Sequence, residues 1–265
     1  MLEKALTINN TKYLSSVNYK QLIEHDKRLI ENGIAKKDFA VADSLAIMKS
    51  ALKFLGGHDE ELKTINEIDY PEIFKGGIDK FDNSEIIKIY PEWSELVRNR
   101  HSIRTFKNKI IPADVVYKII DDAKYYPSAC NRQMCKVYFS DDPVKVQKIL
   151  NLVPDQFVVK NNIFDALVVT CDRSLLGSAE LNDQEFINSG IFLGYLVTSI
   201  HAHGLGSCLF QMLRRNAHGA AKVRKALNIP DNEIIACFIG FGEPEEKFVT
   251  ACAARRETED VAIKI

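Results

Sequence analysis

The stretch Arg100-His101-Ser102-Ile103-Arg104 is the most informative in this chain. It places two guanidinium groups, an imidazole and a hydroxyl within five positions, between two predicted helices. A second stretch, Pro127-Ser128-Ala129-Cys130-Asn131-Arg132-Gln133, gathers small and amide residues in a proline-led turn after the second of those helices. Positive charge and planar hydrogen-bonding groups on both sides of one short helix suit a ligand with an anionic tail and a flat polar ring.

Helices and strands alternate irregularly around these two stretches. We expect helices over 93–100, 112–125, 142–151, 182–203 and 217–227, strands over 136–140, 165–172 and 233–241, and a strand or loop over 207–212. The run DALVVTCD at 165–172 is an almost continuous apolar run, as in a strand buried on both faces, and the mostly apolar helix at 182–203 should also be buried. Because the elements do not form regular strand–helix pairs, the pattern favours an α+β sandwich over a doubly wound sheet.

The first part of the chain has a different character. Residues 1–92 are expected to be a helical extension with a linker, and residues 93–265 the main domain. Helices are expected over 19–32 and 38–55, each followed by glycine. The broad apolar stripe of the second helix favours core packing over recruitment of a partner. The stretch from there to about Pro91 is acidic and broken by glycines and prolines, which is typical of a linker.

Composition limits the classes of function. The 265 residues are 46% apolar and 27% charged, and the net charge is −1. Such a chain has no global attraction to nucleic acid or to an anionic membrane, so an anion site must be a local cluster. No apolar run approaches the roughly 20 residues that span a bilayer, and Met1-Leu2-Glu3-Lys4 leads into polar sequence rather than a secretion signal.

The cysteines indicate the redox compartment. All six (130, 135, 171, 208, 237 and 252) lie in the second half of the chain, and several lie in apolar runs. No second pair of cysteine or histidine residues completes a zinc site, so no metal is expected. We expect reduced cysteines, a packed core position for Cys208, and a cytoplasmic protein.

The basic stretch has a plainer explanation when it is taken alone. Positive charge at a helix end is favourable in the field of the helix dipole, so a solvated patch is an equally good interpretation. Arg255-Arg256 adds a second pair of guanidinium groups, which could bind a phosphate dianion through forked hydrogen bonds. The alternative for this pair is a surface ion pair with Glu257 or Glu259, worth about 0–1 kcal/mol.

Five motifs occur in a fixed order along the second part of the chain. They are RHSIRTF (100–106), PSACNRQ (127–133), GLGSCLFQM (204–212), IGFGEP (239–244) and RRETEDV (255–261). In this order they resemble the nitroreductase family of FMN enzymes, over about residues 94–265. The resemblance implies an α+β sandwich with a mixed, mostly antiparallel sheet flanked by helices. It also implies an intertwined homodimer with FMN at the subunit interface.

The resemblance further assigns cofactor-binding roles to individual residues. The ribityl-phosphate and the pyrimidine side of the ring would be lined by Arg100, His101, Ser102 and Arg104. The loop that reaches FMN from the partner subunit would supply Pro127, Ser128, Ala129, Asn131 and Gln133. The segment whose backbone approaches the reactive nitrogen N5 would be Leu209, Phe210 and Gln211, and the phosphate clamp would be Arg255 and Arg256. Arg104 beside N1 and the C2 carbonyl would stabilise reduced flavin.

The chain departs from the family pattern at three places. Met134-Cys135 stands where a Pro-Trp pair is common, and Ala253 stands where a basic residue is usual. Arg256 could compensate for the second change, which otherwise removes about 1.5–3 kcal/mol of charged hydrogen bonding to phosphate. The helical extension is not part of the minimal family domain.

Together these features predict an FMN-dependent oxidoreductase. It would take hydride from NAD(P)H and pass it through flavin N5 to a small acceptor such as a nitro compound or a quinone. The sequence shows no nucleophile elbow, zinc-protease motif or Walker loop, as expected where the catalytic atom belongs to the cofactor. Two alternatives stay open: a specialised flavin oxidase or reductase of a biosynthetic intermediate, and a non-catalytic flavin-binding or interaction module.

Overall fold

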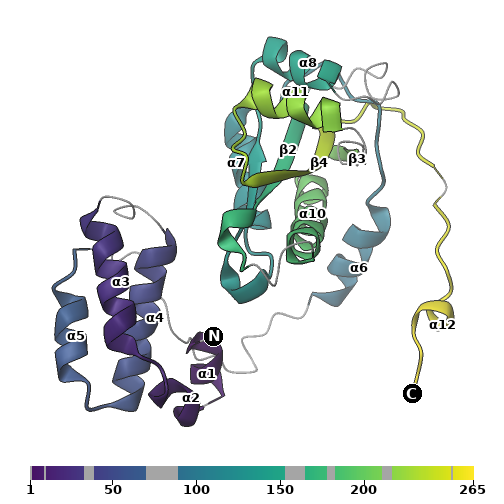
Figure 1. Cartoon of the computed structure of the whole chain (residues 1–265). Coiled ribbons are helices and arrows are strands. Elements are labelled where there is room, and N and C mark those ends of the chain that lie inside the picture. The colour runs from purple at the N-terminus through teal and green to yellow at the C-terminus, as the bar shows by residue number, and fades with distance from the viewer. Residues whose placement is uncertain are drawn as a thin grey trace. The chain divides into compact units, whose positions relative to one another are not determined.

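The computed structural model describes residues 2–8, 10–32, 39–69, 89–152, 165–177, 183–210, 217–251 and 253–265. The chain divides into two compact units, Met1–Lys88 and Ile89–Ile265, which are called the N-terminal and C-terminal units below (Figure 1). No helix in the described ranges is long and apolar enough to cross a membrane.

The N-terminal unit is helical. Its elements are α1 (Leu2–Thr7), α2 (Thr11–Ser15), α3 (Tyr19–Glu31), α4 (Phe39–Leu55) and α5 (Asp59–Asn66). Asn18 caps α3 by accepting a hydrogen bond from the backbone N–H of Gln21, which satisfies one of the free donors at the helix start. Leu14, Ile23 and Leu45 lie in a buried cluster, so the unit has a hydrophobic core of its own.

Helix α5 corrects the expectation that the chain after Leu55 is a linker. Asp59, Glu60 and Glu61 occupy its first turn, where negative charge is favourable beside the helix N-terminus. Ile65 is fully buried in the cluster of the N-terminal unit. The acidic composition that suggested a linker therefore belongs in part to a packed helix.

The C-terminal unit is built on a four-stranded sheet. Its strands are β1 (Cys135–Tyr138), β2 (Asp165–Asp172), β3 (Gly206–Phe210) and β4 (Glu233–Gly242), in the order β1-β2-β4-β3. All three pairings are antiparallel, and a bulge interrupts the β2–β4 register between Val169 and Thr170. Every residue of β2 is buried, as its mostly apolar sequence predicts.

Helices cover both faces of this sheet (Figure 1). The helices of this unit are α6 (Tyr90–Asn99), α7 (Ala113–Ala123), α8 (Pro143–Leu152), α10 (Gln184–Ala202), α11 (Ala217–Leu227) and α12 (Thr258–Val261), with 3-10 turns η2 (Ala129–Asn131) and η3 (Arg173–Leu175). Helix α12 has no buried residue and lies away from the sheet. Helices α7 and α10 share a core with Leu167 and Val169 of β2. Helices α8 and α11 share a separate core with Val168 of the same strand. The predicted α+β sandwich is thus confirmed.

Helix α10 is less buried than its sequence suggests. Phe192, Leu196 and Ile200 face the sheet and are buried. Ile187 and Tyr195, at helical spacing on the other side, keep 52% and 45% of their surface exposed. The expectation of full burial is wrong for the single chain, because the described residues of its own unit leave one apolar stripe of this helix partly exposed.

Asp165, at the start of β2, makes stability depend on pH. Its carboxylate is buried and accepts the backbone N–H of Ile111 at 2.8 Å. Burial raises the pKa of Asp165 from 3.8 to about 6, so the folded protein binds this proton more tightly than the unfolded chain. The contribution of Asp165 to the free energy of unfolding is therefore largest below its pKa in the unfolded chain. It is lost as the pH rises through 6, and the total loss is about 3 kcal/mol at most.

We expect Asp165→Asn to be more stable than the wild type at pH near 7.5, because the amide oxygen still accepts from Ile111 and no buried charge remains. The difference should shrink as the pH falls toward 5. Urea unfolding at several pH values measures it. A difference that stays constant over this range would contradict the assignment, and Asp114→Asn, at an exposed position on α7, is the control.

Candidate functional site

The basic run (residues 100–104) is held alongside the edge strand β3. Arg100 ends α6 with extended backbone angles, so the chain leaves the helix as a strand-like segment. The N–H of Ile103 donates to the carbonyl of Ser207 at 3.0 Å, and Ser102 pairs with Ser207 in a parallel bridge. Two of the sequence-predicted segments are therefore neighbours in the fold.

A glycine makes this close approach possible. A Cβ atom built at Gly206 would lie 2.9 Å from the Cβ of Ile103, closer than real Cβ atoms come. Ile103 is itself buried in the core shared with α8 and α11. The absence of a side chain at Gly206 thus sets how near the basic run lies to β3.

Helix α10 brings His201 near the start of the basic run. Burial lowers the pKa of His201, and the nearby Arg100 and His101 lower it further, so this imidazole is mostly uncharged at neutral pH. His201 is about a hundred residues away in sequence and was not predicted as a site residue. Arg104 is exposed, and its guanidinium donates to the carbonyl of Ser102 at 3.3 Å.

Ion pairs fix the chain immediately after the run. Phe106 is buried and pairs with Pro244, and the N–H of Lys107 donates to the carbonyl of Glu243 at 2.8 Å. The ammonium groups of Lys107 and Lys109 lie 2.6 and 2.7 Å from the Glu243 carboxylate. Their hydrogen bonds lower the pKa of Glu243 to about 2. These contacts join the RHSIRTF motif to the IGFGEP motif.

The predicted loop at 127–133 has an unusual backbone. Cys130, Asn131 and Gln133 have φ angles of 52°, 52° and 48°, in the left-handed region that non-glycine residues rarely adopt. Such a conformation persists only where surrounding contacts enforce it. Loops with stored backbone strain are concentrated at ligand sites.

Two side chains enforce the shape of the loop. Ser128 accepts the N–H of Gln133 at 3.1 Å, and the buried Asn188 of α10 accepts the N–H of Ala129 at 2.8 Å. Asn188 also donates to the carbonyl of Gln184 at 2.7 Å, so its amide is fixed on both sides. Ser128 therefore has a structural use within the loop. Sequence reasoning missed Asn188, since nothing in its spacing distinguishes it from other polar residues of a helix.

The strand next to the basic run carries the other predicted contacts. Leu209 is 44% exposed and Phe210 is buried. Gln211 lies outside the described residues. Cys208 is buried in the core with Ile103, as expected for a packed thiol.

A family model for the nitroreductase family matches residues 97–180 and 166–243, which together make up more than half of the chain. The chain belongs to the nitroreductase family. The match includes the basic run, the 127–133 loop and all four strands of the sheet, and it confirms the resemblance that the five motifs suggest.

Known proteins agree with this membership. An NADPH-dependent oxidoreductase of Staphylococcus aureus is 24% identical over 164 residues, which cover 57% of this chain and 64% of that protein. The chain therefore spans less than two thirds of that relative. The solved nitroreductase family protein of Streptococcus pneumoniae has a TM-score of 0.56 at 19% identity, covering 65% of this chain and all of that one. The FMN-dependent nitroreductase of Clostridium difficile has a TM-score of 0.51 at 23% identity, covering 63% and 93%.

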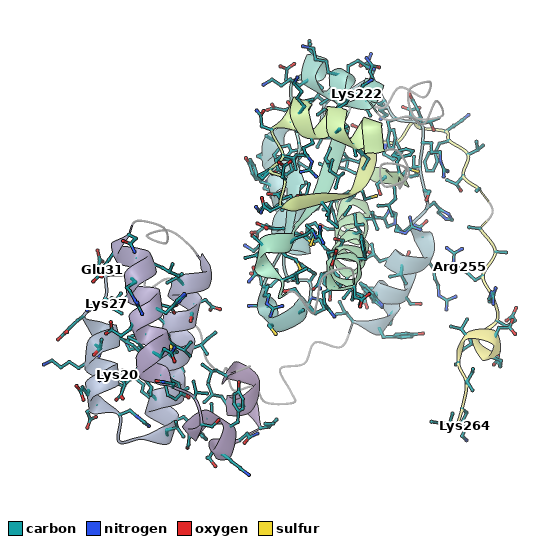
Figure 2. All side chains as sticks on the ribbon, in the orientation of Figure 1. Lys20, Lys27, Glu31, Lys222, Arg255 and Lys264 are labelled. Carbon is teal, nitrogen blue, oxygen red and sulfur yellow. The ribbon has the colours of Figure 1, made fainter. Side chains whose placement is uncertain are left out.

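In this nitroreductase-family chain, neither of the two C-terminal arginines has a described hydrogen bond or ion pair with the basic run. Arg255 donates to the carbonyl oxygens of Ala253 and Ala254, and Arg255 and Arg256 are both exposed. They belong to an extended C-terminal segment (residues 245–265), in which nearly every described residue is exposed and on which Figure 2 marks Arg255. The single chain brings the run and β3 together, but it does not bring this pair to them.

Beside α6, the exposed stripe of α10 forms an open groove of about 600 Å³. Its walls include Trp93 and Val97 of α6 and Ile191 and Tyr195 of α10. Each of these four side chains is at least 36% exposed. An exposed patch of large apolar residues of this kind marks an interaction surface.

Proposed function

We propose that this protein is an FMN-dependent oxidoreductase that transfers hydride from NAD(P)H to a small acceptor, such as a nitro compound or a quinone. The observation that carries the proposal is the pairing of the basic run with β3. It joins two of the segments predicted to bind flavin, and it holds the guanidinium groups of Arg100 and Arg104 in one segment beside β3. Two guanidinium groups in one segment fit a phosphorylated ligand.

Each segment of the site has a role that follows from its chemistry. The Arg100 and Arg104 guanidinium groups, with His101 and Ser102, would bind the phosphate and the polar edge of the ring. The backbone at Leu209 and Phe210, with Gln211, would lie near the ring, because β3 presents an exposed side chain there. When bound, FMN would accept hydride at N5 and pass it on. The relatives named above support this cofactor and NADPH as the donor.

We further propose that the active form is a homodimer. The groove between α6 and the apolar stripe of α10 is open among the described residues. A second copy of this chain is its proposed occupant. The C-terminal segment has exposed Val261, Ile263 and Ile265 at 73%, 86% and 115%. In a dimer, this segment could bring Arg255 and Arg256, and the partner's loop could bring Pro127, Ala129, Asn131 and Gln133, to the flavin. The described cysteines are free thiols, which supports the cytoplasm as the compartment.

The proposal is tested by the absorption spectrum of the purified protein, by its NADPH oxidation activity and by one substitution. The purified protein should show flavin absorption and should oxidise NADPH when menadione or a nitroaromatic compound is added. Arg104→Ala should bind FMN about ten- to a hundred-fold more weakly, because one charged hydrogen bond is worth about 1.5–3 kcal/mol. Flavin reduction by NADPH should also slow. Titration of the apoprotein with FMN and stopped-flow spectroscopy measure the two effects.

Arg98→Ala is the matched control, since it removes the same charge from the exposed surface of α6, where Arg98 donates to Ser94. Equal FMN affinity in both variants would overturn the role of Arg104. A colourless protein that cannot be reconstituted would overturn the function itself. Bound FMN without turnover would instead favour a flavin-binding module.

A further inference from the structure

Two cysteines face each other across the first two strands of the sheet. Cys135 of β1 and Cys171 of β2 are direct partners in the antiparallel register. Only β2 neighbours β1, so this pair lies at an edge of the sheet. Among the described cysteines, this is the one pair placed opposite each other on adjoining strands.

The hydrogen-bond pattern shows which kind of pair this is. The N–H of Asp172 donates to the carbonyl of Met134 at 2.8 Å, so the neighbouring pair Met134–Asp172 has the close backbone bond. Antiparallel pairs alternate, and Cys135–Cys171 is therefore a non-hydrogen-bonded pair. The N–H of Cys135 accordingly points away from β2 and donates to the Tyr126 hydroxyl at 3.3 Å. In such pairs the Cα atoms lie about 4.5 Å apart, within the range of about 4.4–6.8 Å found in disulfides.

The two thiols differ in accessibility and in acidity. Cys135 is half-buried, whereas Cys171 is fully buried. A hydrogen bond from the Cys171 thiol lowers the pKa of Cys135 against the opposing effect of burial, and the Tyr126 hydroxyl contributes in the same direction. The same contact, together with burial, raises the pKa of Cys171. The Cys135 sulfur can thus react as a thiolate, while the Cys171 sulfur next to it stays protonated as a thiol.

We propose that Cys135 and Cys171 form a reversible dithiol–disulfide site that is oxidised by hydroperoxides. The Cys135 thiolate attacks one peroxide oxygen, the O–O bond breaks, and the other oxygen leaves as water after taking up a proton. The resulting sulfenic acid condenses with the Cys171 thiol, which forms the S–S bond and releases a second water. Overall, two thiols and one hydrogen peroxide give one disulfide and two waters.

The location gives the disulfide a structural consequence. Strand β1 has four residues and begins two positions after the 127–133 loop. A covalent link from its first residue to β2 would fasten the edge strand at the point where the loop enters it. The site is independent of FMN, because neither Cys135 nor Cys171 is among the residues proposed to bind the cofactor.

Peptide mapping of the full chain tests the proposal. The reduced protein is treated with hydrogen peroxide, blocked with N-ethylmaleimide and cleaved with trypsin without reduction. Cleavage places Cys130, Cys135 and Cys171 in separate peptides, covering 125–132, 133–136 and 161–173. We expect the peptides 133–136 and 161–173 to appear linked, at the summed mass less two hydrogens, and to separate with dithiothreitol.

Cysteine substitutions identify which two thiols form the disulfide. Cys135→Ser and Cys171→Ala should each abolish the linked peptide, while Cys208→Ser and Cys130→Ser should retain it. The peptide map of the wild-type protein tests the link even if the Cys171→Ala variant, which changes a buried residue, folds poorly. A link between 125–132 and 133–136 would overturn the proposal. So would full maleimide labelling of Cys135 at a peroxide concentration that has already oxidised the exposed Cys130.

Discussion

Replacing Gly206 with alanine is expected to destabilise the C-terminal unit and to weaken flavin binding together. The new Cβ would lie 2.9 Å from the Ile103 Cβ, an atom fixed to the backbone that cannot turn away. Either β3 or the basic run must shift, which breaks the Ser102–Ser207 bridge on which the site is built. Overpacking of this kind costs about 1–3 kcal/mol in free energy of unfolding.

The chain offers a graded set of controls for this prediction. A Cβ at Gly242 would meet Phe106 at 3.3 Å, so Gly242→Ala should cost less than Gly206→Ala. A Cβ at Gly194 on α10 meets nothing within 4 Å of the same subunit, so Gly194→Ala should be neutral or stabilising by about 0.5–1 kcal/mol for the single subunit. Gly194 also lines the groove proposed for the dimer, so this comparison applies to unfolding of the monomer.

Urea unfolding followed by the fluorescence of Trp93, the only tryptophan, reports on the C-terminal unit. FMN titration gives the second readout. If Gly206→Ala and Gly194→Ala unfolded at the same urea concentration, the close contact between Gly206 and Ile103 would be unimportant to this fold.

Glu233→Ala is expected to give the largest loss of stability without touching the candidate site. The buried Glu233 carboxylate, at the start of β4, accepts hydrogen bonds from Lys136 at 2.6 Å, Tyr138 at 2.9 Å and Thr170 at 2.6 Å. The truncation leaves the fully buried Thr170 hydroxyl without this acceptor and removes the anion that Lys136 pairs with. Because Lys136 is half exposed, we expect about 3 kcal/mol rather than the full penalty of a broken buried pair.

The neighbouring Asp231→Ala is the matched control. Asp231 is completely exposed and lies 4.0 Å from Arg224, so its removal should change the free energy of unfolding by less than about 0.5 kcal/mol. FMN affinity per folded molecule should stay near the wild-type value in Glu233→Ala. A similar loss of stability in the two variants would show that the buried network contributes little.

Local sequence patterns predicted those parts of the fold that depend on local chemistry. The mostly apolar run DALVVTCD predicted β2 over its full length, because a strand buried on both faces is apolar at most of its positions. The helix at 217–227 was predicted with the bounds of α11. Helix α5 was missed, because the acidic first turn that favours a helix N-terminus also resembles a linker in composition.

The candidate site was predictable only in part, for a related reason. The basic run and β3 could be identified as separate motifs, and their pairing follows from the fold. His201 and Asn188 reach the site from α10, a helix about sixty to a hundred residues further along the chain. The opposition of Cys135 and Cys171 likewise depends on register, which no local pattern reveals. The placement of Arg255 and Arg256 requires, in our proposal, a second chain.

The outward stripe of α10 would constrain how this protein can vary. In a closed two-fold assembly the same patch serves both subunits, so every substitution on it enters the interface twice. A change at Ile187 or Tyr195 that slightly favours or disfavours association would therefore have its effect doubled. Substitutions on this face should therefore be tolerated mainly in combinations that compensate for one another.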